Sequence, residues 1–158
     1  MMQPRSHKIA RTTYDLVANH QNEEKALKKS NDEGKIESND KDKQKAYGAL
    51  VHKLPAMILQ NGLAHATGFL LAKGRDEHIA VLKDLKDAFN KTSHYNFAEP
   101  EDFHAQLINA DLQKTMYMTR HALEIAGWMR RYVQGILKIG ATGDSEEPEQ
   151  KDHQETPT

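Results

Sequence analysis

Residues 54–73 read LPAMILQNGLAHATGFLLAK and form the least polar window of a strongly polar chain. Pro55 lies near the start of this window, and Asn61-Gly62 lies in its middle. Asn-Gly is a strong turn signal, because glycine adopts positive φ without a Cβ clash. The window therefore predicts one helix that ends at Asn61 and a second that starts at or just after Gly62. Pro55 either kinks the first helix or restarts it, since proline lacks a backbone N–H.

The second half of the window predicts close helix packing. Small residues occupy positions 62, 64, 66, 68 and 72, and small side chains let a neighbouring helix approach closely. Leu63, Ala66 and Leu70 share one helix face at spacings of three and four. We expect this hairpin to form the centre of a helical core.

Two alternatives compete for the same window. It is about as long as a membrane span, but bilayer insertion would be costly for the polar residues in its middle, Gln60, Asn61, His65 and Thr67. The glycines at 62, 68 and 74 fit neither a Walker A motif nor a dinucleotide fingerprint, and no strand precedes them. We therefore favour a helical hairpin inside a soluble domain over a membrane helix or a phosphate-binding loop.

Length and composition predict one intracellular domain. A chain of 158 residues is long enough to bury about two thirds of its unfolded surface. Cysteine is absent, which excludes a disulfide framework and a thiolate metal site. No apolar run follows the first basic residues, so we expect no signal peptide and a cytoplasmic location.

The net charge of −1 conceals an acidic tail. Residues 140–158 carry six Asp or Glu and one lysine, which leaves the rest of the chain at about +4. The tail has no large aliphatic or aromatic residue, so it cannot offset the entropy lost on ordering. We predict a helical domain over 1–139 and a disordered acidic tail over 140–158. A body of this charge is too weakly basic to imply nucleic acid by itself.

Hydrophobic periodicity predicts five to six helices and no strand, and hence an all-α bundle. The first helix runs from Ser6 to about Lys29, followed by a polar linker over about 30–40. The second begins near Asp40. Gly74 is the predicted end of the next helix, and Asp76 is the predicted N-cap of the helix after it. That helix carries Ile79, Leu82, Leu85 and Phe89 on one face and is followed by a loop over 91–100. A further helix has Pro100 in its first turn and the apolar anchors Phe103, Leu107 and Ile108.

The last helix, about Asp111 to Ile139, is the longest. Its apolar residues fall on two adjacent rows, which predicts a wide buried face. The first row is Leu112, Met116, Thr119, Leu123 and Ala126, and the second is Met118, Ala122, Ile125, Met129, Tyr132 and Ile136.

The sequence contains no recognisable active site. The nine histidines include no pair at metal-binding helical spacing, and acids adjacent to His78 and His104 point away from them on a helix. His65 lies in the apolar window and is interpreted as a hydrogen-bonded structural residue. No nucleophile has an evident base. We therefore expect no enzymatic activity, no metal and no cofactor.

Basic residues on the last helix form a possible phosphate-binding row. Gln113, Arg120, Arg131 and Lys138 recur at spacings of 7, 11 and 7, which places them on one helical face together with Gly127. Such a row could follow the phosphates of a single strand. Alternatively, these cations only complement the helix dipole and keep the helix soluble.

Two ordered motifs resemble the signatures of a known family. Tyr47, Lys53-Leu54-Pro55, Asn61-Gly62-Leu63, Phe69-Leu70 and Lys73 form the first, and Tyr117, Thr119, Ala122, Leu123, Trp128 and Arg131 form the second. Both resemble the small all-helical subunit of the type III-B CRISPR RNA-guided effector complex, the Cmr complex. The resemblance covers about 43–137. The sequence departs from it at 65–69, where the family often has Gln-Thr-Leu-Ala-Phe, and in the charged region 19–45 and the tail.

The resemblance implies a non-catalytic role in antiviral defence. Subunits of this type stack into an inner filament and help form the channel in which target RNA pairs with guide RNA. Partners would be copies of the chain itself, other subunits, and the guide and target RNA backbones, with no membrane. The residues expected to contact RNA or neighbouring subunits are Lys53, Lys73, Arg120, Arg130, Arg131 and Lys138. Trp128 is expected in the core rather than as a stacking platform.

Two other functions stay open on the sequence alone. One is a free-standing helical adaptor or homo-oligomer that binds a protein through the central hairpin. The other is a small metal-dependent hydrolase that uses His65, His78 or His104.

Overall fold

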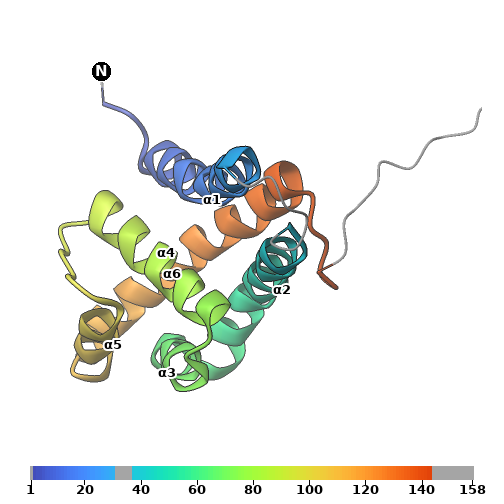
Figure 1. The fold of residues 1–158 in the computed structure, drawn as a ribbon. Coiled ribbons are helices and arrows are strands. Elements are labelled where there is room, and N and C mark those ends of the chain that lie inside the picture. The colour runs from blue at the N-terminus through green and yellow to red at the C-terminus, as the bar shows by residue number, and fades with distance from the viewer. Residues whose placement is uncertain (1, 31–36, 144–158) are drawn as a thin grey trace, which may run out of the picture.

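The computed structural model describes residues 2–30 and 37–143, and these residues form a helical bundle without β-strands (Figure 1). This confirms the predicted all-α fold. Most of the predicted polar linker and the charged part of the predicted acidic tail lie outside the described residues. The helices are α1 (Arg5–Ser30), α2 (Glu37–Asn61), α3 (Leu63–Lys73), α4 (Asp76–Thr92), α5 (Pro100–Ile108), α6 (Leu112–Tyr132) and a π-helical turn η1 (Val133–Leu137).

Helix α4 is the centre of the bundle. It packs against each of the other five α-helices, and Figure 1 shows α4 and α6 crossing in the middle with the others around them. Leu82, Leu85 and Phe89 of α4 are completely buried, as their shared face predicted. The expectation that the α2–α3 hairpin forms the centre is therefore wrong. Its apolar residues belong to the core, but the central position falls to α4.

The hairpin itself forms as predicted. Helix α2 ends at Asn61, Gly62 has φ 88°, and α3 begins at Leu63. Helix α2 continues through Pro55 without a restart. The face of Leu63, Ala66 and Leu70 is buried. Close packing occurs at Gly68, where an added Cβ would lie 3.3 Å from the His104 ring of α5.

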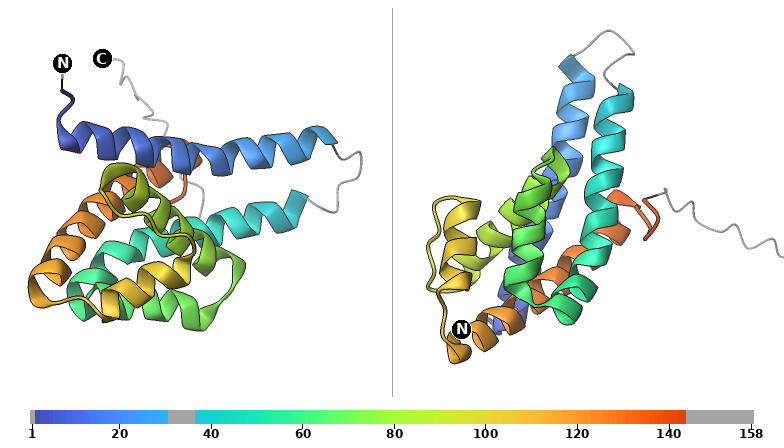
Figure 2. Two further views of the ribbon diagram at one scale, coloured as in Figure 1. Left: turned by 90° about the vertical axis from the view of Figure 1, so that its left-hand side faces the viewer. Right: turned by 90° about the horizontal axis from the view of Figure 1, so that it is seen from below.

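The polar half of α1 has a structural explanation. In both views of Figure 2, the C-terminal half of α1 and the N-terminal part of α2 lie side by side and extend beyond the other helices. The apolar anchors Ile9, Leu16 and Val17 are buried in the first half of α1, as predicted. Few neighbours surround the projecting pair, so polar side chains are sufficient there.

One buried carboxylate joins three helices. The Tyr47 hydroxyl of α2 donates to Asp84 Oδ2 of α4 at 2.6 Å, and His20 Nε2 of α1 lies 2.7 Å from the same oxygen. Burial raises the pKa of Tyr47 well above its ordinary value, and the Asp84 charge raises it further. The hydroxyl therefore stays protonated and remains a donor.

Several predicted helix boundaries differ in the structure. Helix α2 begins at Glu37, earlier than expected, and the N-cap of α4 is Arg75 rather than Asp76. Gly74 ends α3 in the left-handed conformation, as predicted. The regular part of the last helix ends at Tyr132, because the next five residues form a π-helical turn that Lys138 closes at φ 57°.

The first apolar row of the last helix is only partly buried. Leu112 is 75% exposed and Met116 48% exposed, whereas the second row from Met118 to Met129 is buried. Ile108, predicted as an anchor of α5, is 62% exposed. Ile108 is the last residue of α5, and Leu112 and Met116 lie in the first two turns of α6. We call them the apolar corner.

We predict that Tyr47→Phe lowers the free energy of unfolding by roughly 1–3 kcal/mol, because a buried carboxylate loses a hydrogen-bond donor while the ring stays. Urea denaturation measures this change. The matched control is Tyr14→Phe, since Tyr14 is 49% exposed and its hydroxyl serves no buried charge that the structure describes. Equal stability losses for the two variants would contradict the role assigned to Asp84.

Candidate nucleic-acid interface

The six cations named from the sequence are all exposed. Lys53 lies on α2, Lys73 in the last turn of α3, and Arg120, Arg130 and Arg131 on α6, with Lys138 just after η1. Within residues 2–30 and 37–143, none of the six forms an ion pair with a carboxylate. Their charges are therefore not neutralised by the described part of the chain.

The structure keeps part of the predicted row. Arg120 and Arg131 are 11 residues apart on the regular part of α6, which corresponds to about three turns and one face. Gly127 leaves open space between them, since an added Cβ would meet nothing within 4 Å. Lys138 follows a π-helical turn, whose i→i+5 hydrogen bonds rotate each residue less than an α-helix does. The helical spacing that placed Lys138 on the row therefore does not apply.

Aromatic rings support Arg131. Its guanidinium lies 5.3 Å from the ring centroid of Trp128, which stacks on Tyr132 at 5.6 Å and 23°. The Tyr14 ring of α1 meets Tyr132 edge-on at 5.4 Å. Trp128 is only half-buried, so it packs on the core with one side and holds a cation with the other. Lys73 has a similar arrangement, 5.8 Å from the Phe69 ring.

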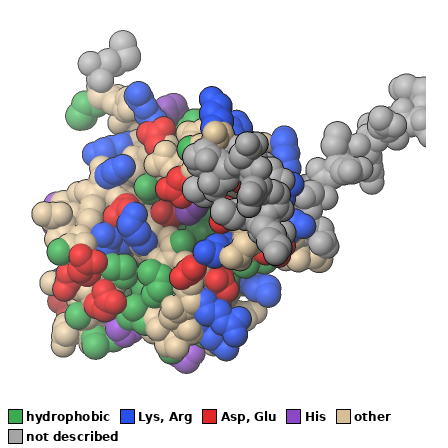
Figure 3. Space-filling view, viewed as in Figure 1, with side chains coloured by type: hydrophobic (Ala, Val, Ile, Leu, Met, Phe, Trp, Pro, Cys, Tyr) green, Lys and Arg blue, Asp and Glu red, His purple; other side chains and the backbone are tan. Residues whose placement is uncertain are grey.

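The face of the molecule seen in Figure 3 does not carry one sign of charge. Figure 3 shows acidic and basic side chains interspersed over the visible face. Some lysines outside the set of six are paired, for example Lys83 with Asp87 at 3.6 Å and Lys43 with Asp76 at 3.3 Å. What the six cations share is therefore the absence of a carboxylate partner in the described chain, rather than a local excess of basic residues.

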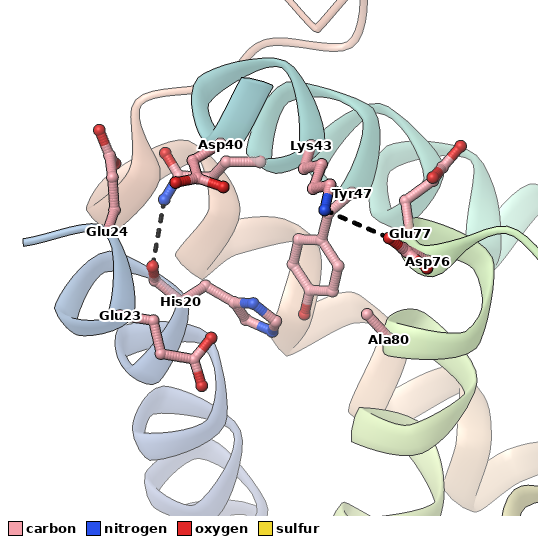
Figure 4. Close-up of a pocket in the computed structure, with 10 residues that line it drawn as sticks. His20, Glu23, Glu24, Asp40, Lys43, Tyr47, Asp76, Glu77 and Ala80 are labelled. Carbon is pink, nitrogen blue, oxygen red and sulfur yellow. Dashed lines mark hydrogen bonds and ion pairs between the residues drawn. The ribbon is translucent and has the colours of Figure 1, made fainter. Parts of the chain in front are cut away.

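A cavity of about 210 Å³ lies between α1, α2 and α4 (Figure 4). His20 and Tyr47 project toward its interior, and the Lys43–Asp76 ion pair spans part of its rim. Its carboxylates come from the following residues: Glu23, Glu24, Asp40, Asp76 and Glu77. Among the described residues, no three His, Asp or Glu side chains converge closely enough to hold a metal ion. The acidic lining would repel a phosphate backbone.

The histidines have roles that differ from those predicted. His65 is exposed and its side chain forms no hydrogen bond within the described residues, so its interpretation as a hydrogen-bonded structural residue is wrong. His104 Nδ1 lies 2.7 Å from Thr67 Oγ1 and joins α5 to α3. Burial lowers the pKa of His78, with Arg75 and Lys73 lowering it further against the opposing effect of Glu77.

Among the described residues, no helix is long and apolar enough to cross a membrane.

Sequence reasoning missed His121, which is completely buried. Its Nδ1 contacts the Arg5 guanidinium of α1, and its Nε2 lies 2.7 Å from Thr92 Oγ1 of α4. Burial first, and then the Arg5 charge, lowers the pKa of His121 to about 4. The neutral ring therefore links three helices. No local pattern identifies it, because its partners are distant in sequence.

Comparisons with known proteins agree on one family. The family model described as CRISPR-associated protein (Cas_Cmr5) matches residues 5–136. The CRISPR system Cmr subunit Cmr5 of Thermus thermophilus is 27% identical over 92 residues, which are 58% of this chain and 75% of that protein. The X-ray structure of a CRISPR-associated Cmr5 family protein from the same species matches with a TM-score of 0.63 and 22% identity, covering 86% of this chain and 99% of that one.

We predict that acid destabilises the fold through His121. Its pKa is near 6.5 in the unfolded chain and about 4 in the folded one, so the unfolded chain binds the proton first as pH falls. This contribution to stability is complete above pH 6.5 and is lost progressively toward pH 4, where the loss reaches roughly 3 kcal/mol. Urea denaturation of wild type and His121→Gln across this range tests it. A stability difference that does not vary with pH would contradict the prediction.

Proposed function

The chain belongs to the Cmr5 family of CRISPR-associated proteins, and from this membership we propose that it is the small structural subunit of a type III-B Cmr effector complex. The match over residues 5–136 carries the proposal, because it includes both sequence signatures and every helix from α1 to α6. In this role the chain stacks with copies of itself in an inner filament and helps form the channel for guide and target RNA. It catalyses no step of its own.

The six exposed cations support contact with RNA phosphates. A phosphate backbone requires cations but no base-specific contacts, since pairing with a guide supplies the sequence selectivity. Arg120 and Arg131 are the strongest candidates, because the regular part of α6 places both on one face. A body charge of only about +4 predicts weak RNA binding by the isolated chain and firm retention within an assembly.

The apolar corner supports contact with another protein. Ile108, Leu112 and Met116 expose apolar surface, and the other large aliphatic residues exposed in the described chain are Met2 and Leu59. Exposed apolar groups that lie together are typical of protein–protein interfaces. We propose that this corner faces a neighbouring subunit. The alternative adaptor function places the partner instead on the α2–α3 hairpin, where Leu59 is 71% exposed.

Purification from the native host distinguishes these two functions. We expect the tagged wild-type chain to elute with short RNA and several partner proteins. The double variant Leu112→Asp with Met116→Asp should remain folded and lose the partners, because two charges enter a desolvated interface. The matched variant Leu59→Asp should keep them. Elution as an RNA-free homo-oligomer, or loss of partners only with Leu59→Asp, would support the adaptor and contradict the proposal.

Retention of target RNA by the reconstituted complex tests the phosphate contacts. We expect Arg120→Glu with Arg131→Glu to leave helix content and assembly unchanged and to weaken retention about tenfold or more at physiological salt. The slope of log affinity against log salt should fall by roughly 0.7 for each phosphate that is no longer neutralised. Arg11→Glu with Lys91→Glu makes the same charge change at exposed positions outside the six that also form no ion pair within the described chain. Equal effects of the two double variants would show that only net charge matters.

A further inference from the structure

An aromatic surface lies where the loop over residues 93–99 passes the beginning of α6. The His94 ring stacks on Tyr95 with centroids 4.5 Å apart, and Tyr117 of α6 lies 6.4 Å from both rings. His94 is exposed, Tyr117 is 37% exposed and Tyr95 is partly buried. We call these three residues the aromatic platform. In the left view of Figure 2, the loop between α4 and α5 faces the viewer below the N-terminal half of α1.

The platform rests on rigid parts of the fold. Tyr95 stacks on the buried Phe97 at 5.3 Å and 12°, and Tyr117 stacks on the buried His121 at 6.0 Å and 13°. Two hydrogen bonds of 2.8 Å between the Asn90 side chain and the Phe97 backbone hold the loop against α4. The rings are therefore held in place before any ligand arrives, which reduces the entropic cost of binding.

Cations lie over two rings of the platform. The Arg5 guanidinium is 5.7 Å from the Tyr117 centroid, and Lys114 Nζ is 5.4 Å from the Tyr95 centroid. The Asp111 carboxylate is also near Tyr95, and it accepts a hydrogen bond from the Lys114 backbone N–H at 2.8 Å as the N-cap of α6. Arg120 lies one helical turn beyond Tyr117 on α6. The platform thus combines exposed ring surface with cations on more than one side.

We propose that the aromatic platform stacks an unpaired base of single-stranded RNA, which deepens the proposed function and rests on it. Every nucleobase has a flat π-face, so stacking on aromatic side chains is tolerant of sequence and adds affinity to phosphate contacts. Arg5 and Lys114, which lie over the Tyr117 and Tyr95 rings, supply positive charge for the phosphates that flank a stacked base. A protein partner would not require cations beside stacked rings, so the charge complementarity favours nucleic acid.

Titration of the isolated full chain at low salt tests this proposal. The probes are a fluorescent decaadenylate and a ribose-phosphate decamer of equal charge without bases. We expect the wild-type chain to bind the decaadenylate at least about fivefold more tightly than the abasic decamer, the lower end of the range for stacking on one ring. Aromatic carbon–proton NMR spectra should show shifts at Tyr117, Tyr95 and His94 with the decaadenylate only.

Single substitutions distinguish the contribution of the aromatic rings to binding from that of the cations. Tyr117→Ala should abolish the preference for bases, Tyr117→Phe should keep it, and His94→Ala should reduce it from a loop position. Arg120→Glu should weaken binding of both decamers equally. The stacking proposal would be overturned if the wild-type chain bound the two decamers equally, or if the preference for bases survived Tyr117→Ala. The phosphate contacts would then still be tested separately, by retention of target RNA in the complex. Loss of subunit assembly by Tyr117→Ala without any change in base preference would assign the platform to a protein partner and overturn it as well.

Discussion

The Asp84 carboxylate is buried where α1, α2 and α4 meet, and its hydrogen bonds fix how these helices pack. A buried carboxylate requires donors, because desolvation of a charge without partners costs several kcal/mol. Tyr47 and His20 supply those contacts from two other helices. A shift of α2 along α4 that apolar packing alone could accommodate would break the Tyr47 hydrogen bond. The network therefore favours the packing in which both Asp84 contacts form.

The same constraint determines which groups remain for function. Asp84, Tyr47 and His20 stabilise the bundle around the acidic cavity, and His121 is occupied by Arg5 and Thr92. The polar side chains best suited to catalysis are thus already engaged in contacts between helices. What stays free lies outside this interior: cations without carboxylate partners in the described chain, the apolar corner and the aromatic platform. These are features suited to binding, and Met116, Tyr117 and Arg120 bring one residue of each to the N-terminal half of α6.

Local patterns were sufficient for the helices and insufficient for their arrangement. The turn at Gly62, the stop at Gly74 and the face of Leu82, Leu85 and Phe89 depend on neighbouring residues, so the sequence predicted them correctly. Burial of Leu112 depends on whether another helix reaches it, which periodicity does not report. The π-helical turn before Lys138 likewise has no local signal, because it arises where the chain leaves α6 and packs Ile139 against Gly48 of α2.

The candidate site shows the same division. Exposure of cations such as Arg120 and Arg131 followed from their polar helix face, whereas the aromatic platform joins a loop and a helix more than 20 residues apart. A weakly charged scaffold gains from such a platform. Phosphate contacts lose strength steeply as salt rises, but stacking on a ring depends little on ionic strength. A chain with a body charge of about +4 can therefore hold a strand at physiological salt only if uncharged contacts or neighbouring subunits share the binding free energy.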